Sequence, residues 1–268
     1  MNNGMTSPLE QHAGRLRTRM GGAFVGQRAV FRGHDLHAEL GDMDWLALYT
    51  FGITGQRYTP AQIKVLHAIW VFTSYPDARI WNNRVAALAG SARSSGNLGV
   101  AAALAVSEAE IYGRGIDIRA AGFIQRARQA LAAGEGVDAC VREELKRHRA
   151  IAGYGRPIAA GDERIAPMLR LIEQQGLADG AHLQAALAVE KHLQDGRWRL
   201  RMNYAALAAA LTADMGFTPR QHYQFTFPAF LAGMQPCYIE ASEQPAGTLL
   251  PLACDNIAYE GPASRSWP

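Results

Sequence analysis

The sequence contains little lysine, few cysteines and no long apolar segment. Only three of its 27 basic residues are lysine, in a chain of 268 residues. The three cysteines show no C-x-x-C spacing, which argues against a zinc site and favours reduced thiols in a cytoplasmic protein. No apolar run approaches the roughly 20 residues that a membrane-spanning helix needs, so no membrane partner is expected. Residues 1–29 also lack the apolar segment of a secretory signal and are interpreted as an N-terminal arm.

The charge pattern argues against two further classes of site. The formal net charge is +3, and no basic stripe is interleaved with aromatic residues, so no nucleic-acid partner is expected. His34 and His37 lie three residues apart without a third candidate ligand, and no metal site is predicted. The excess of arginine suits contacts with phosphate and carboxylate groups, but a GC-rich genome produces the same excess.

The spacing of apolar residues predicts an all-α fold. Apolar side chains recur at intervals of three and four in segments rich in alanine and leucine. A proline at the first helical position predicts helices that begin at Pro60 and Pro219. Segment 98–111 is alanine-rich with little polarity, so we expect a buried helix there. No alternating pattern long enough for a strand is found, and Pro228 and Pro236 are expected to kink or interrupt the last long helix.

The most informative motif lies in the middle of the chain. Gly153-Tyr154-Gly155-Arg156 is followed after a short interval by Gly161-Asp162-Glu163-Arg164. This arrangement resembles the active-site loop of the citrate synthase and citryl-CoA lyase superfamily, which usually has G-[FY]-G-H and then D-P-R. The aspartate is present, but Arg156 stands where the family has its histidine.

The resemblance extends over residues 30 to 262 in the order that the family has. The similar segments are Arg32–Leu36, Trp45–Tyr49, Val100–Gly113, His182–Leu193, Arg201–Tyr204 and Ile257–Pro262. The short chain and the segment His182–Leu193 resemble the citryl-CoA lyase branch more than full-length citrate synthases.

The resemblance implies a citrate synthase fold with a large and a smaller helical domain. Residues 30–117 and 205–268 would form the large domain, and residues 118–204 would form a small domain that closes over the cleft. It also implies a homodimer whose clefts include residues of both subunits. The substrate would be an acyl thioester of coenzyme A, with no tightly bound cofactor. The residues expected to contact coenzyme A are Gly153, Tyr154 and Gly155.

The reaction of the family needs a base that removes a proton from the α-carbon and a donor that stabilises the thioester oxygen. By resemblance, Asp162 would be the base and Tyr112, which falls where a donor histidine is expected, would donate to that oxygen. Arg156 would hold an oxyanion or another anion. Each residue also has a structural interpretation: Asp162 as a helix N-cap, Tyr112 as a filler of space, and Arg156 as the salt-bridge partner of Glu110 or Asp162.

Substrate binding is expected to differ from that of the family. Segment Phe72–Asp77 replaces another histidine-containing segment, Phe230 stands where an arginine is expected, and Pro251–Cys254 replaces a second arginine. Each lost cation removes a charge-assisted hydrogen bond of about 1.5–3 kcal/mol. A second substrate less polar than oxaloacetate or citrate is therefore expected. The candidate substrate-binding residues are Tyr75, Asn203 and Phe230.

Two functions are consistent with these residues. The first is an acyltransferase or lyase of the citrate synthase type, which makes or breaks a carbon–carbon bond next to an acyl thioester and has little true citrate synthase activity. The alternative is a catalytically inactive homodimer of the same fold that acts as a binding or regulatory protein.

Overall fold

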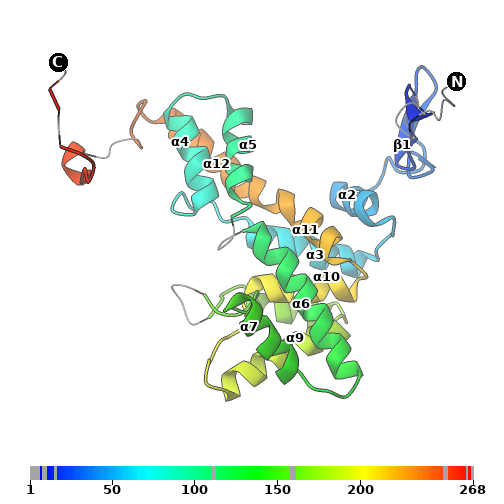
Figure 1. Cartoon of the computed structure of the whole chain (residues 1–268). Helices are drawn as coiled ribbons and strands as arrows, with labels where there is room; N and C mark the ends of the chain where they lie inside the picture. Colours follow the sequence, from blue (N-terminus) through cyan, green and yellow to red (C-terminus); the bar gives the residue numbers. More distant parts are fainter. Residues whose placement is uncertain are drawn as a thin grey trace, which may run out of the picture. The chain divides into compact units, whose positions relative to one another are not determined.

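The computed structural model describes residues 7, 11–14, 17–109, 113–156, 161–249, 253–263 and 265–266 (Figure 1). The chain divides into two compact units, residues 1–63 and 64–268. The first unit holds a small sheet and helix α2, and the second holds most of the helices. The predominantly helical fold expected from the sequence is therefore confirmed.

The first unit contains a three-stranded antiparallel sheet that the sequence did not predict. Its strands β1 (Gly21–Phe24), β2 (Arg28–Phe31) and β3 (His34–Asp35) pair in chain order. Strands of four, four and two residues are too short to show a period of two, which explains why the sequence pattern missed them. Helix α2 (Trp45–Thr54) follows, with the Asp44 side chain accepting from the Leu46 amide at 2.9 Å.

Ten further helices and two 3₁₀ turns follow in the described part of the chain. They are α3 (Pro60–Thr73), α4 (Trp81–Ser91), α5 (Gly96–Val106), α6 (Arg114–Ala132), α7 (Asp138–His148), α8 (Ile165–Gln174), α9 (Ala181–Asp195), α10 (Tyr204–Asp214), α11 (Pro219–Thr226), η1 (Phe227–Phe230), α12 (Leu231–Glu243) and η2 (Cys254–Asn256).

The expected helix starts are confirmed, and the expected proline breaks are confirmed in part. The Thr59 hydroxyl accepts from the Gln62 amide at the start of α3, and Thr218 forms a capping box with Gln221 at the start of α11. Pro228 lies in the 3₁₀ turn η1, which separates α11 from α12. Pro236, in contrast, lies inside α12, which continues through it.

Helices α4, α5 and α12 pack against one another in the second unit (Figure 1). Gly90 of α4 approaches α12 so closely that a Cβ atom there would lie 2.3 Å from the carbonyl oxygen of Tyr238. The expectation of a fully buried helix over 98–111 is wrong in two respects. Helix α5 ends at Val106, and its outer face is exposed, with Leu98 69% accessible.

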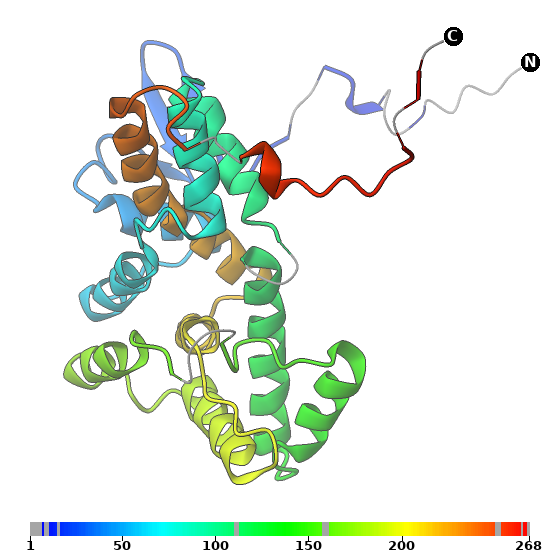
Figure 2. The same ribbon diagram turned by 90° about the vertical axis from the view of Figure 1, so that its left-hand side faces the viewer.

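Helix α10 forms the centre of a second group of helices. It packs against α6, α9 and α11 (Figure 2). Every residue from Ala206 to Ala213 is buried. Alanine at five of these positions lets the neighbouring helices approach closely. This central helix begins at Tyr204, directly beside the loop that carries the candidate site.

Candidate functional site

Two glycines shape the loop that contains Tyr154. The φ angles of Gly153 and Gly155 are +89° and +84°, in the left-handed region that favours glycine. A Cβ atom at Gly153 would also lie 2.5 Å from the Cβ atom of Ala206 in α10. The loop can therefore lie against the first turn of α10 only because residue 153 has no side chain.

The loop pairs with the segment that leads into α10. Gly155 donates to the Arg201 carbonyl at 2.7 Å, and Asn203 donates to the Gly153 carbonyl at 2.9 Å. The Asn203 side chain caps α10 by accepting from the Ala205 amide, and its Nδ2 donates to the Gly155 carbonyl at 2.8 Å. Both polar atoms of this candidate substrate-binding residue are therefore occupied, one in capping α10 and the other in holding the loop.

Tyr154 is a structural anchor of the same loop. Its side chain is buried, and its hydroxyl donates to the Ala186 carbonyl of α9 at 2.9 Å. Burial, with a smaller effect from the charge of Glu190, raises the pKa of Tyr154 well above its usual value. The phenol is therefore a neutral donor in the core.

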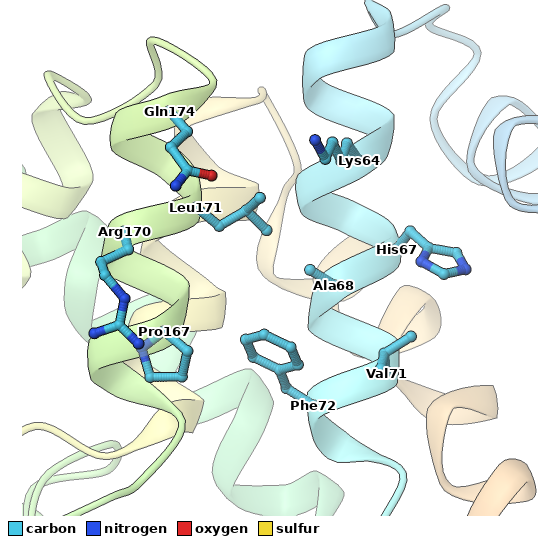
Figure 3. A pocket seen from close by; sticks show the side chains of 9 residues that line it. All are labelled: Lys64, His67, Ala68, Val71, Phe72, Pro167, Arg170, Leu171 and Gln174. Atoms are coloured by element: carbon cyan, nitrogen blue, oxygen red, sulfur yellow. The ribbon is translucent and has the colours of Figure 1, made fainter.

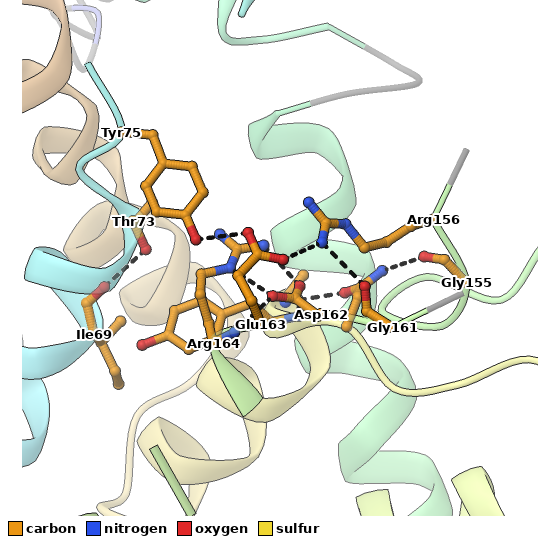
Figure 4. Close-up of polar contacts among 12 residues, drawn as sticks. Ile69, Thr73, Tyr75, Gly155, Arg156, Gly161, Asp162, Glu163 and Arg164 are labelled. Atoms are coloured by element: carbon orange, nitrogen blue, oxygen red, sulfur yellow. Dashed lines mark hydrogen bonds and ion pairs between the residues drawn. The ribbon is translucent and has the colours of Figure 1, made fainter. Parts of the chain in front are cut away.

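Asp162 lies in a buried ion pair. Its side chain is 0% exposed, and its two oxygens accept from Nε and Nη2 of Arg164 at 2.8 and 2.7 Å (Figure 4). Oδ2 also accepts from the Tyr204 amide at 2.9 Å, at the N-terminus of α10. The cap of the following helix suggested by the sequence is not formed, because the N-cap residue of α8 is Arg164 and no side chain caps that helix. The Asp162 side chain instead accepts from the first amide of α10.

The same contacts set the charge of Asp162. Burial raises its pKa, but the hydrogen bonds and the positive charge of Arg164, together with the Tyr204 amide, have the larger combined effect. The net result is a pKa below the usual value, so the carboxylate is ionised near neutrality. A base must reach the proton that it removes, and in this structure both oxygens of Asp162 are already occupied.

The Arg164 guanidinium contacts two aromatic rings in addition to the carboxylate of Asp162. Its guanidinium carbon lies 4.6 Å from the centre of the Tyr204 ring and 5.4 Å from the centre of the Tyr75 ring. Such cation–π contacts add to the ion pair in fixing the guanidinium. The charge of Arg164 is therefore neutralised by Asp162, and its guanidinium contacts the rings of Tyr204 and Tyr75.

Glu163 occupies the more accessible side of the same turn. Its Oε1 accepts from the Tyr75 hydroxyl at 2.8 Å, and its Oε2 pairs with Nη1 of Arg156 at 2.6 Å (Figure 4). Burial and the bond to Glu163 raise the pKa of Tyr75 to about 12. The pKa of Glu163 is lowered by a hydrogen bond from its own backbone amide and, to a smaller extent, by the hydrogen bonds from Tyr75 and Arg156. Arg156 thus pairs with Glu163, and the salt bridge to Asp162 suggested from the sequence is not formed. Glu110, the other suggested partner, lies outside the described residues.

We call Tyr75, Arg156, Asp162, Glu163 and Arg164 the loop cluster. The structure brings together three candidate residues from the sequence in this cluster and adds Glu163 and Arg164. The helix-capping pattern of the sequence indicated the turn that contains Glu163 and Arg164. No sequence pattern indicates which arginine each carboxylate pairs with. Phe230 is not part of this cluster and packs against the core residues Ala86, Val100, Ala103 and Met234. Tyr112 falls outside the described residues.

A groove of about 470 Å³ lies between α3 and α8 (Figure 3). Phe72 and Leu171 project into it from the two helices, and Lys64, Arg170 and Gln174 line its edges. The Phe72 ring also lies 6.3 Å from the ring of Tyr204, which supports Arg164. The groove therefore adjoins the loop cluster and offers a largely apolar lining.

The described residues contain no group of histidine, cysteine, aspartate and glutamate side chains that could hold a metal ion. In the same part of the chain, no helix is both long and apolar enough to cross a membrane.

Comparison with known proteins identifies the fold. No family model matches the sequence, and no curated protein matches it. Citryl-CoA lyase from Hydrogenobacter thermophilus superposes with a TM-score of 0.82 and 21% identity, over 95% of this chain and 98% of that one. ATP citrate lyase from Methanosaeta concilii, solved with (3S)-citryl-CoA, gives a TM-score of 0.75 and 15% identity, and the match covers 93% of this chain but 42% of that one.

Citrate synthase from Thermoplasma acidophilum, solved with carboxymethyl coenzyme A and oxaloacetate, gives a TM-score of 0.63 and 16% identity. The match covers 84% of this chain and 58% of that one. The chain therefore has the fold of citryl-CoA lyase and citrate synthase, which confirms the fold inferred from its motifs.

The geometry of Asp162 predicts a strong effect on stability. In Asp162→Asn, the neutral amide leaves the positive charge of Arg164 largely buried without its partner, and we expect a loss of about 3 kcal/mol in the free energy of unfolding. Because the pKa of Asp162 is lowered in the folded state, its contribution is fully present at pH 7 and is lost as the pH falls through the folded-state pKa. Urea denaturation at pH 7 measures the loss.

Asp179→Asn is the matched control, because it makes the same chemical change at an exposed position. We expect the control to change the free energy of unfolding by less than about 0.5 kcal/mol. Equal stability of the two variants would contradict a structural role for Asp162.

Proposed function

We propose that this chain is an enzyme of the citrate synthase or citryl-CoA lyase type that makes or breaks a carbon–carbon bond next to an acyl-CoA thioester. The fold supports the proposal, as do the solved structures of that fold that hold citryl-CoA or a coenzyme A analogue. Gly153, Tyr154 and Gly155 are the proposed contacts to coenzyme A. The proposal includes closure of residues 118–204 over the thioester.

We further propose a second substrate that is less polar than oxaloacetate or citrate. The observation that carries this part is that both arginines of the loop cluster are paired with carboxylates of the chain itself, at 2.6 Å for Arg156 and 2.7 Å for Arg164. A polycarboxylate would have to displace these carboxylates before it gained its own charge-assisted hydrogen bonds. The apolar lining of the adjacent α3–α8 groove suits a less polar partner.

The chemistry would begin with removal of the α-proton of the acyl group. Asp162 is the base that the resemblance implies, and it can act only when its bidentate pair with Arg164 opens. The electron pair of the C–H bond would form the enolate, whose oxygen would accept hydrogen bonds from Arg156 and Tyr112. Attack of the enolate carbon on a carbonyl group would form the new bond, and the reverse sequence would break it. Tyr75 and Asn203 would position the second substrate, Tyr75 through its contact with Glu163 and Asn203 through its contact with Gly155. Phe230 is a further proposed contact to the second substrate.

A catalytically inactive binding protein is the second candidate function. The burial and pairing of Asp162 favour it, because a carboxylate with both oxygens occupied is a poor base. Such a protein would keep the homodimer and the thioester site without the reaction.

Exchange of α-protons separates the two candidates. For the enzyme, we expect the wild-type chain to exchange the methyl protons of acetyl-CoA into deuterated water. Loss of the base in Asp162→Asn should slow exchange by about 10²–10⁴, as measured by mass spectrometry at a temperature where both proteins are folded. Asp179→Asn should exchange at the wild-type rate.

If the wild type binds acetyl-CoA but shows no exchange with it, the inactive binding protein is the function. If Asp162→Asn exchanges as fast as the wild type, Asp162 is only a structural residue and another group is the base.

We also propose that the chain forms a homodimer through the outer face of α5. Leu98 is 69% and Val106 is 39% exposed there, and Ala101, Ala102 and Ala105 are exposed between them. Small side chains along one helix face allow a second helix to approach closely across a twofold axis.

A charge placed on this face should separate the subunits. Sedimentation of the wild type at micromolar concentration should give twice the 29.1 kDa monomer mass, and Leu98→Asp should sediment as a monomer. Leu131→Asp, on the exposed part of α6, is the control and should remain a dimer. A monomeric wild type would rule out the proposed dimer.

A further inference from the structure

Glu163 makes the contacts that a bound small carboxylate would make. One oxygen accepts from the Tyr75 hydroxyl at 2.8 Å, and the other pairs with the guanidinium of Arg156 at 2.6 Å. A guanidinium group and a neutral hydroxyl that both donate to one carboxylate are typical of sites that recognise carboxylate ligands. Here the carboxylate belongs to the chain.

The two donors reach Glu163 from separate parts of the sequence. Tyr75 lies after α3, 88 residues before Glu163, and Arg156 lies seven residues before it in the glycine loop. Arg156 also donates to the Gly161 carbonyl at 3.1 Å, which fixes its guanidinium close to the turn that carries Glu163. The donors are therefore positioned by the fold as well as by Glu163.

Glu163 and Asp162 differ in how easily they could be displaced. The side chain of Asp162 is 0% exposed and supports the start of α10, so its removal breaks buried structure. The side chain of Glu163 is 58% exposed, and Arg156 beside it is 24% exposed. Rotation of Glu163 into solvent would uncover Arg156 and Tyr75 without opening the core.

We propose that Glu163 is a specificity-determining residue that fills a carboxylate-binding site formed by Arg156 and Tyr75. The inference rests on the proposed function, whose less polar second substrate it explains. Because the Glu163 carboxylate is tethered to the site, it competes with free carboxylate ligands at an effective concentration in roughly the millimolar range or above. A free carboxylate at micromolar concentration is therefore excluded from the wild-type site.

The site can be tested with a carboxylate probe and without any thioester. Succinate is titrated into the full chain by calorimetry, for the wild type, Glu163→Ala and Glu173→Ala. Glu173 lies on the exposed face of α8, so its removal makes the same change in net charge away from the loop cluster. A double variant, Glu163→Ala with Arg156→Gln, removes both the competitor and the cation, and thermal melting establishes that each variant is folded.

We expect Glu163→Ala to bind succinate at least about tenfold more tightly than the wild type. Glu173→Ala should bind like the wild type, and the double variant should lose the gain. Equal affinity of Glu163→Ala and the wild type would overturn the proposal. An equal gain in Glu173→Ala would do so as well, because it would show an effect of net charge alone, and an undiminished gain in the double variant would show that Arg156 is not the receptor.

The outcome is separable from that of the proposed function. Failure of the chain to bind or exchange acetyl-CoA would remove the enzyme proposal but would leave a gain of succinate binding in Glu163→Ala unchanged. Failure of that gain, with exchange intact, would leave the enzyme and remove only the role of Glu163.

Discussion

The buried ion pair between Asp162 and Arg164 is the interaction on which the candidate site depends. It links the turn before α8 to the first amide of α10, because Oδ2 of Asp162 accepts from Tyr204 as well as from Arg164. Tyr204 and Tyr75 cover the guanidinium from the sides. Helix α10 is the buried centre of its helix group, so a disturbance of this pair would reach the core as well as the loop. A buried charge without its partner is among the costliest defects in a folded protein.

The charges of the loop cluster are balanced within the chain. With Asp162 on Arg164 and Glu163 on Arg156, the loop cluster contains its own counter-charges. The glycine loop keeps its shape independently of them, through the left-handed conformations of Gly153 and Gly155 and the contacts with residues 201–203. A scaffold with the fold of citryl-CoA lyase thus carries a site whose cations are already satisfied. This combination supports the proposed second substrate that is less polar than a polycarboxylate.

The sequence was sufficient for much of the fold, because the local signals agreed with the tertiary structure. Proline and threonine marked the starts of α3 and α11, and the glycine motif marked the loop beside α10. The sheet was missed because its strands are too short to show a pattern. The exposed face of α5 was missed because alanine fits both buried and exposed positions of a helix. The partners of Arg156 and Arg164 could not be predicted, since two carboxylates and two arginines within nine residues allow several pairings, and only the fold selects among them.

The central claim is that the chain binds an acyl-CoA thioester in a site closed to polycarboxylates. Calorimetric titration of the purified wild-type chain with acetyl-CoA, and separately with citrate, tests it most directly. The account predicts saturable binding of acetyl-CoA and no binding of citrate up to roughly millimolar concentration, where a ligand would gain only about 4 kcal/mol. Tight binding of citrate by the wild type, or no binding of any acyl-CoA thioester, would contradict it.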